Sequence, residues 1–234
     1  MSAQLSPICI EGRFGRGFVR HCLAALYLLA AVWCVAATLD TAGMQQKLVS
    51  RFGSARVVLL NNWFQLLATG QSLGEEEKIK RVNDFFNQFI QFESDSSAWQ
   101  QSDYWATPLE TMGGGRGDCE DFAIAKYYSL RLTGVPVSKM RLIYVKANRG
   151  NGAEAHMVMA YYSTPTADPL ILDNLESEMR PASKRTDLTP VFSFNSQGIY
   201  GGVAGTEKAT SGGTGRLSRW EDLMRRARAE GFLD

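Results

Sequence analysis

Beyond its first 40 residues, the chain contains one thiol and one imidazole. The sequence has four cysteines and two histidines in all. Those within the first 40 residues are Cys9, His21, Cys22 and Cys34. The rest of the chain therefore holds only Cys119 and His156, the two residue types that nucleophilic catalysis by a thiolate needs. The alternative for Cys119 is a buried side chain that packs as a small hydrophobe.

The residues around Cys119 favour the catalytic interpretation. The cysteine follows Asp118 directly, and aspartate is a residue type that caps helices. A glycine-rich segment at 113–117 comes before Asp118. The sequence CEDFAIAKYYSLRLTG that follows has helical spacing, so Cys119 is expected in the first turn of a helix. Unpaired N–H groups and the helix dipole stabilise a thiolate there and lower its pKa. The Cys119 N–H is an expected oxyanion donor, and the glycines are expected to let a substrate approach the backbone.

A base and an orienting acceptor are available for this thiol. His156 lies in a predicted strand, and Asp173 ends the next predicted strand 17 residues later. Two neighbouring antiparallel strands can place these side chains together on one face. Asp173 would then accept from His156 and fix its tautomer. The alternatives are a core histidine for His156 and a turn residue at a strand end for Asp173.

Three acids crowd the predicted start of the helix: Asp118, Glu120 and Asp121. Acids at a helix N-terminus are ordinarily partners of the helix dipole. Three carboxylates beside a thiolate would nevertheless raise its pKa. A bound hard cation such as Ca²⁺, which takes several oxygen ligands, would remove this conflict. The spacing is not that of an EF-hand, so the residues alone leave both interpretations open.

The positioning elements follow from hydrophobic periodicity. Helices are predicted over 44–68, with a break at Gly53, from Glu75 to about residue 90, and over 119–134, and a loop is predicted over 93–118. Strands are predicted over 140–147, 155–162, 169–173, 191–195 and 198–200. Helices followed by an antiparallel sheet predict an α+β fold.

The two ends of the chain read as additions to one domain. Arg13, Arg16 and Arg20 precede an uncharged apolar run over 22–37, which is shorter than the ~20 residues of a membrane span. This pattern predicts a signal peptide over 1–37; an uncleaved anchor or a buried helix are the alternatives. A domain over 38–200, a Gly/Ser/Thr-rich tether over 201–215 and an amphipathic helix over 216–234 complete the chain. This last helix is expected to dock on its own domain or move in solution, with binding to a membrane surface as the alternative.

The overall composition excludes several classes of protein. The chain has 234 residues, of which 45% are hydrophobic, and 25 Lys and Arg balance 24 Asp and Glu to give a net charge of +1. A nucleic-acid-binding protein usually has a clear basic excess, and a disordered chain has low hydrophobicity with high net charge. The composition therefore predicts a folded domain that does not bind nucleic acid. No apolar run of membrane-spanning length follows the front segment, so no stable span is expected after its cleavage.

Three short motifs carry a resemblance to a known family. G-D-C-E-D-F-A at 117–123, A-H-M-V at 155–158 and L-D-N-L at 172–175 resemble the bacterial transglutaminase-like cysteine proteinases, and within them the LapG type. The resemblance covers roughly residues 44–200 and keeps the order Cys, His, Asp. It implies a papain-like or transglutaminase-like fold with its helical N-terminal part packed on an antiparallel sheet. It also implies a periplasmic Ca²⁺-dependent endopeptidase.

The resemblance further implies a substrate, a partner and roles for individual residues. The implied substrate is the N-terminal region of a large surface adhesin, cut within a Thr-Ala-Ala-Gly-type site, which releases the adhesin and disperses biofilm. The implied partner is an inner-membrane receptor that binds cyclic-di-GMP in the cytoplasm and sequesters the protease in the periplasm. The implied catalytic residues are Cys119, His156 and Asp173, and the implied calcium ligands are Asp118, Glu120 and Asp121.

Two other functions fit the same residues. Amide transfer to an amine, which is true transglutaminase chemistry, uses the same triad and differs only in the acceptor. A non-enzymatic calcium-responsive binding module is the alternative from another class. An intact Cys, His and Asp set disfavours this module, because binding alone does not require all three residues.

Overall fold

The computed structural model describes residues 39–150, 152–201 and 214–232. The predicted signal peptide and most of the predicted tether lie outside the described residues. The chain separates into two units, Met1–Asp40 and Thr41–Asp234, and the second unit holds every element discussed below. None of the helices in the described part of the chain combines the length and apolar character needed to cross a bilayer.

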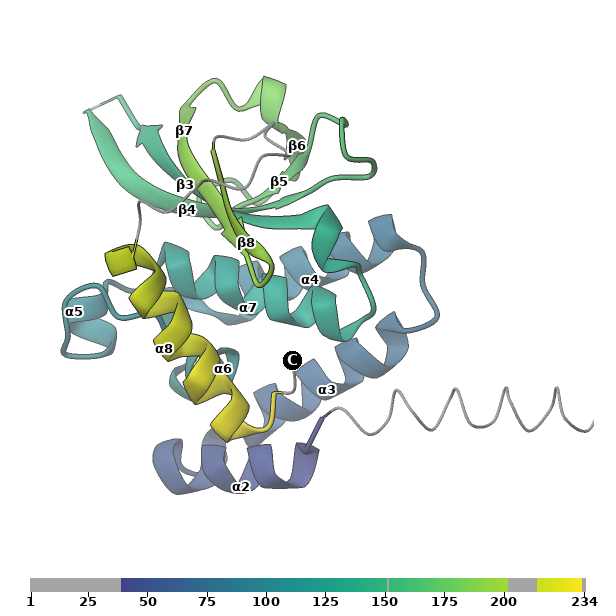
Figure 1. The fold of residues 1–234 in the computed structure, drawn as a ribbon. Coiled ribbons are helices and arrows are strands. Elements are labelled where there is room, and N and C mark those ends of the chain that lie inside the picture. Colours follow the sequence, from purple (N-terminus) through teal and green to yellow (C-terminus); the bar gives the residue numbers. More distant parts are fainter. Residues whose placement is uncertain (1–38, 151, 202–213, 233–234) are drawn as a thin grey trace, which may run out of the picture. The chain divides into compact units, whose positions relative to one another are not determined.

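Helices form the first half of the second unit (Figure 1). They are α2 (Thr41–Phe52), α3 (Val57–Gly70), α4 (Glu75–Phe89) and α7 (Cys119–Leu132), with a short 3-10 turn at Ser54–Arg56. Gly53 has a φ of 79°, and the predicted break in the first helix falls there. Every residue of α7 from Asp121 to Leu130 is buried, so this helix lies at the centre of the fold. Trp63 of α3 donates from Nε1 to Ser129 Oγ of α7 at 2.8 Å, which ties two helices together.

A six-stranded antiparallel sheet packs against α7 (Figure 1). Its strand order is β6-β5-β4-β3-β7-β8. The strands are β3 (Met140–Asn148), β4 (Ala153–Tyr161), β5 (Leu170–Leu172), β6 (Arg180–Pro181), β7 (Leu188–Asn195) and β8 (Gly198–Gly201). The predicted strands are therefore present, with β6 as an addition, and the α+β fold class is confirmed. Alternate residues of the strands form an apolar cluster around Ile143, Val158 and Ile171. Ala182 and Leu188 pack against this cluster.

The prediction of a loop over 93–118 is wrong in part. Helices α5 (Asp95–Ala98) and α6 (Pro108–Gly114) form within it, and β1 (Gln91–Phe92) pairs in parallel with β2 (Arg116–Gly117). Helix α6 begins with a capping box, in which Thr107 Oγ1 accepts from the Glu110 N–H and Glu110 Oε2 accepts from the Thr107 N–H. The chain before Cys119 is thus held by regular backbone hydrogen bonds.

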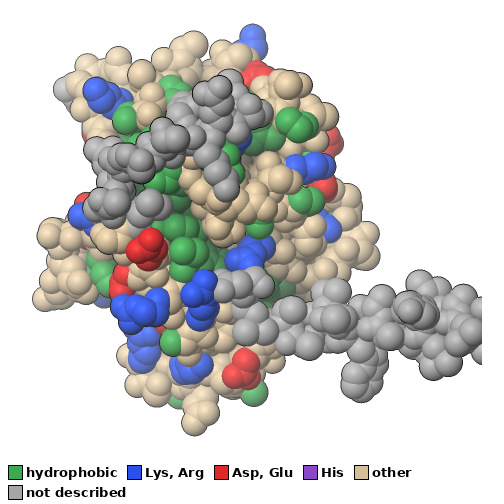
Figure 2. Space-filling model, viewed as in Figure 1, with side chains coloured by type: hydrophobic (Ala, Val, Ile, Leu, Met, Phe, Trp, Pro, Cys, Tyr) green, Lys and Arg blue, Asp and Glu red, His purple; other side chains and the backbone are tan. Residues whose placement is uncertain are grey.

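The tail helix α8 (Thr214–Glu230) is docked on its own domain. Trp220, Leu223 and Ala227 are buried, and Arg226 donates to Glu110 Oε2 of α6 at 2.5 Å. Basic side chains gather over α8 and α2 on the face that Figure 2 shows. Because the apolar side of α8 packs on the protein itself, that side is not free to lie on a membrane surface.

Candidate active site

Cys119 is the first residue of α7 and lies beneath strand β4. Asp118 is the N-cap residue of the helix, as the sequence predicts. The Met157 N–H acts to lower the pKa of the thiol, and Met157 follows His156 directly in β4. The fold therefore brings the only thiol of the described residues next to the residue pair that contains the only described imidazole. The thiol donates to Glu120 Oε2 at 2.8 Å.

The expected lowering of the Cys119 pKa is wrong for the protein chain alone. Burial against β4 raises the pKa of the thiol far above its usual range, and the Glu120 and Asp118 carboxylates raise it further. The Met157 N–H acts in the opposite direction but is the weaker influence. A thiolate at this position therefore needs additional positive charge.

The side chains of His156 in β4 and of Asp173, which follows β5, are in contact and buried. Strands β4 and β5 are antiparallel neighbours, with Met159 opposite Leu172, so the two residues lie at the same end of the strand pair. His156 Nε2 lies 2.8 Å from Asp173 Oδ1, and both side chains are almost completely buried. This contact uses Nε2 of the imidazole, so Nδ1 is the ring nitrogen that Asp173 does not engage.

The Asp173 carboxylate is fully supplied with donors. Oδ1 also accepts from the Leu175 N–H at 3.0 Å, and Oδ2 accepts from Arg185 Nη2 at 2.7 Å. Burial acts to raise the pKa of Asp173, but the hydrogen bonds from His156, Leu175 and Arg185 lower it to about 2. Asp173 is therefore held as an anion beside the imidazole.

The backbone carbonyl of Asp173 is hydrogen-bonded to side chains of helices α4 and α7. Its carbonyl oxygen accepts from Lys126 Nζ at 3.0 Å and from Asn87 Nδ2 at 2.8 Å. Lys126 Nζ also donates to the side-chain oxygens of Asn83 and Asn87, so the buried ammonium has three acceptors. The end of β5 is thereby fixed to α4 and α7.

A second group of carboxylates lies beside the thiol. Single oxygens of Asp95, Asp118 and Asp121 all fall within 4.8 Å of one another. Asp121 is completely buried; its Oδ1 accepts from the Ala106 N–H at 2.7 Å and its Oδ2 from Trp99 Nε1 at 2.9 Å. Asp95 Oδ1 and Asp118 Oδ1 are buried with no hydrogen-bond partner among the described residues.

The charges in this acidic group are not balanced by the chain. Burial raises the pKa of Asp118 to about 7, and the neighbouring Glu120 carboxylate adds to the rise. Burial and the charge of Asp118 likewise raise the pKa of Asp95 to about 7. Two neighbouring carboxylates that each have a buried oxygen without a partner are suited to a hard cation such as Ca²⁺.

Gly117 permits the close approach of Asp121 to the backbone before the thiol. A Cβ atom at Gly117 would lie 2.5 Å from Asp121 Oδ2, a distance that real structures do not tolerate. The glycine therefore makes room for an acid of the cluster, whereas the sequence had indicated room for substrate.

The structure brings all six sequence-predicted site residues into two adjoining groups and adds two residues. One group is His156 with Asp173, and the other is Cys119 with Asp118, Glu120 and Asp121 at the start of α7. Met157, which influences the thiol, follows His156 directly in β4. The additions are Asp95, which faces Asp118, and Arg185, which binds Asp173. Neither carries a local sequence signal, because each lies in a segment without periodicity and reaches its partner through the tertiary fold.

Comparisons with known proteins agree with this geometry. Residues 67–191 match the family model of the bacterial transglutaminase-like cysteine proteinases. A structure of Legionella pneumophila LapG is 36% identical, with a TM-score of 0.67, covering 81% of this chain and 98% of that chain. The calcium-bound form is 37% identical, with a TM-score of 0.68, covering 80% of this chain and 99% of that chain. The EGTA-treated form is 36% identical, with a TM-score of 0.69, covering 81% of this chain and 98% of that chain. A comparison with curated protein sequences gave no match.

Proposed function

The chain belongs to the bacterial transglutaminase-like cysteine proteinases, and from this premise we propose that it is a calcium-dependent cysteine endopeptidase. The observation that carries the proposal is the joint placement of the Cys119 thiol against β4 and of the His156 and Asp173 side chains 2.8 Å apart. In this proposal Cys119 is the nucleophile, His156 the acid and base, and Asp173 the residue that orients the imidazole.

In this proposal the three groups share the steps of the reaction as follows. His156 takes the thiol proton on Nδ1, and the sulfur attacks the carbonyl carbon of the scissile peptide, whose oxygen becomes an anion facing the Cys119 N–H. The imidazolium then protonates the departing amine, which leaves a thioester. A water molecule that gives its proton to His156 attacks the thioester, releasing the carboxylic acid and restoring the thiol.

Asp173 has a defined part in each proton transfer. Its carboxylate accepts from His156 Nε2, which fixes the tautomer and stabilises the imidazolium that forms twice in the cycle. The low pKa of Asp173, about 2, keeps the carboxylate ionised throughout. The proton thus stays on the imidazole and does not move to Asp173.

We propose that Asp95, Asp118, Glu120 and Asp121 hold the calcium ion. The unpartnered oxygens of Asp95 and Asp118 support this set, and the existence of a calcium-bound form of a 37% identical protein supports the choice of metal. When bound, the ion supplies positive charge beside the thiol, where Glu120 and Asp118 otherwise disfavour a thiolate. Asp95 was not among the ligands that the sequence indicated.

The biological setting is proposed from the resemblance and from the front segment of the sequence. The basic and then apolar pattern over 13–37 supports export to the periplasm. The LapG-type resemblance supports the N-terminal region of a large surface adhesin as substrate, and its release as the route to biofilm dispersal. It also supports sequestration by an inner-membrane cyclic-di-GMP receptor.

The experiment combines the chain over 38–234 with an adhesin N-terminal fragment that contains a Thr-Ala-Ala-Gly-type site. We expect one cut in the presence of Ca²⁺ and none with EGTA or with Cys119→Ala. An added primary amine distinguishes hydrolysis from amide transfer, because transfer would attach the amine to the new C-terminus. Cleavage by Cys119→Ala at the wild-type rate would refute the proposed nucleophile.

A further inference from the structure

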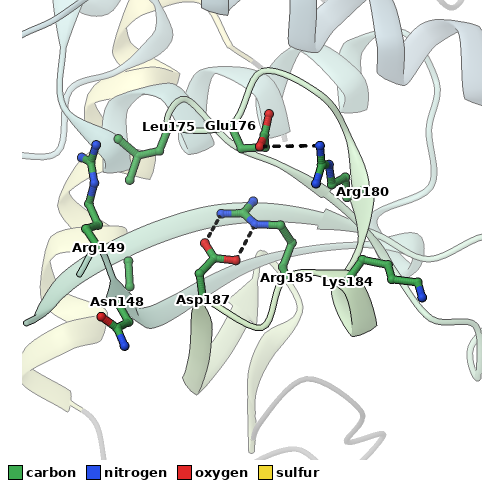
Figure 3. Close-up of a pocket in the computed structure, with 9 residues that line it drawn as sticks. Asn148, Arg149, Leu175, Glu176, Arg180, Lys184, Arg185 and Asp187 are labelled. Carbon is green, nitrogen blue, oxygen red and sulfur yellow. Dashed lines mark hydrogen bonds and ion pairs between the residues drawn. The ribbon is translucent and has the colours of Figure 1, made fainter.

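Arg185 is a buried arginine that contacts the Asp173 carboxylate. It follows the 3-10 turn at Ala182–Lys184 and precedes β7, and only 6% of it is exposed. Its Nη2 donates to Asp173 Oδ2 at 2.7 Å and to Asp187 Oδ2 at 2.8 Å, and its Nε donates to Asp187 Oδ1 at 3.0 Å. Figure 3 shows the guanidinium and the Asp187 carboxylate facing each other along two hydrogen bonds.

The two oxygens of Asp173 have different partners. Oδ1 accepts from His156 and from the Leu175 N–H, whereas the Oδ2 contact is with Arg185. A carboxylate with donors on one oxygen only can turn about its last bond or take up a proton on the free oxygen. The contact at Oδ2 therefore acts together with the Leu175 N–H to keep Oδ1 directed at the imidazole.

We propose that Arg185 is a positioning residue that acts through Asp173, holding its carboxylate ionised and directed at His156 Nε2. The inference rests on the proposed triad and adds a fourth side chain to it. A planar guanidinium suits this task because it bridges Asp173 and Asp187 at fixed angles, which a flexible ammonium does not do. Among the described residues, Arg185 is the only side chain seen to donate a hydrogen bond to Asp173 Oδ2.

Lys126 does not share this role, although it also reaches Asp173. Lys126 Nζ binds the main-chain carbonyl oxygen and leaves the carboxylate untouched. It fixes where the end of β5 lies, whereas Arg185 fixes how the side chain at that end is turned. We therefore expect Lys126 to affect mainly the stability of the fold and Arg185 mainly the chemistry of the triad.

The surroundings of Arg185 provide a matched control. A cavity of about 300 Å³ opens beside it, lined by residues that include Arg180, Arg185 and Asp187 (Figure 3). Arg180 lines the same cavity but pairs with Glu176 and Glu178 and has no contact with the triad in these pairs. Arg185→Gln and Arg180→Gln thus make the same chemical change on the same cavity, and only one of them touches Asp173.

The readout is the rate at which iodoacetamide alkylates Cys119 in the chain over 38–234, which contains no other cysteine. Rates are measured from pH 5 to 9 in saturating Ca²⁺, together with kcat and KM on the adhesin fragment. We expect Arg185→Gln to lower the alkylation rate at pH 7 and kcat by about 10- to 100-fold, the equivalent of one charge-assisted hydrogen bond. KM is expected to stay within about threefold, and Arg180→Gln to match the wild type in both assays.

A double-mutant cycle shows whether Arg185 acts through Asp173. In an Asp173→Asn background, Arg185→Gln is expected to cause no further loss, because the residue through which it acts is already changed. Arg185→Lys keeps a positive charge that reaches one carboxylate, so it is expected to recover part of the rate. Arg185→Lys also keeps the inference testable if Arg185→Gln fails to fold.

Three results would overturn the inference: equal losses from Arg185→Gln in both backgrounds, an equal loss from Arg180→Gln, or no loss from a folded Arg185→Gln. Failure of the proposed function looks different. In that case His156→Ala would leave the alkylation rate of Cys119 unchanged, whatever the Arg185 variants do.

Discussion

Two groups of carboxylates lie in the candidate site, and their surroundings in the chain are opposite. Around Asp173, every carboxylate oxygen has a donor, and the pKa falls to about 2. Around Asp118 and Asp95, one oxygen of each carboxylate is buried without a donor, and the pKa of both rises to about 7. The first group is completed by the protein alone, whereas in the proposed function the second is completed by a cation.

The difference separates two tasks within one site. A carboxylate that orients a histidine must keep one charge and one direction through the cycle, so the chain supplies its partners in advance. A metal site needs oxygens that are left free, so under the proposed function the unfavourable arrangement of charges in the second group is relieved when the ion binds. The following predictions test this division.

The largest effects are expected from the triad. Cys119→Ala and His156→Ala should reduce cleavage to background, and Asp173→Asn should lower kcat by about 10³- to 10⁴-fold, because the amide cannot stabilise an imidazolium. Cleavage of the adhesin fragment in saturating Ca²⁺ measures the effect, and thermal melts verify that each variant is folded. An Asp173→Asn enzyme with near-normal kcat would remove Asp173 from the mechanism.

Removal of the cation is expected to have the next largest effect. EGTA should stop cleavage and lower the melting temperature, Ca²⁺ should restore both, and Mg²⁺ should restore them poorly because it demands tight octahedral geometry. Ca²⁺ at a hundred times its Kd stabilises the fold by about 2.7 kcal/mol.

Variants of the acidic group connect this effect to named residues. Asp118→Ala and Glu120→Ala should lose cleavage and the calcium-dependent rise in melting temperature together. Glu77→Ala, an acid on the exposed face of α4 that pairs with Arg81, is the control and should keep both. An unchanged melt and cleavage rate of the wild type in EGTA would mean that the acids only support the start of the helix.

The sequence predicted those elements in which one residue type or period dominates. The helices on either side of Gly53 and the strands at 140–147 and 155–162 have strong periodicity, and the structure contains them as α2, α3, β3 and β4. The sequence prediction lacks helix α6 although Thr107, Pro108 and Glu110 carry a capping-box pattern, because the polar and glycine-rich composition of 93–118 is typical of a loop.

The site residues could be predicted where their residue types are rare in the chain. The prediction failed where a residue's role depends on burial in the tertiary fold. Cys119 and His156 stand out by count, but Asp95 and Arg185 are common residue types in aperiodic segments. The direction of the Cys119 pKa was wrong because the helix start is a local feature, whereas the burial that outweighs it comes from β4 in the tertiary fold.

The contribution of Asp173 to the free energy of unfolding should decrease as the pH falls. The pKa of Asp173 is depressed from an ordinary value of 3.8 to about 2, so its contribution is complete above pH 4 and is lost as pH falls through 2. The wild type should therefore exceed Asp173→Asn in free energy of unfolding by an amount that shrinks by about 2 kcal/mol between pH 5 and pH 2. Urea unfolding at several pH values measures this, with the exposed Asp84→Asn as control. A pH-independent difference would argue against a compensated carboxylate.

The second group should respond to the same chemical change with the opposite sign. In EGTA, Asp95→Asn is expected to raise the free energy of unfolding by about 1 kcal/mol, because it removes one of two facing buried anions. The amide oxygen can still accept from the Tyr104 N–H, which now donates to Asp95 Oδ2 at 2.6 Å, and the new NH₂ can donate to the unpartnered Asp118 Oδ1. In Ca²⁺ the same variant should be less stable than the wild type, because it has lost a charged ligand. Urea unfolding of both proteins in EGTA and in Ca²⁺ gives the two signs, and a destabilised Asp95→Asn in EGTA would show that this carboxylate is balanced without an ion.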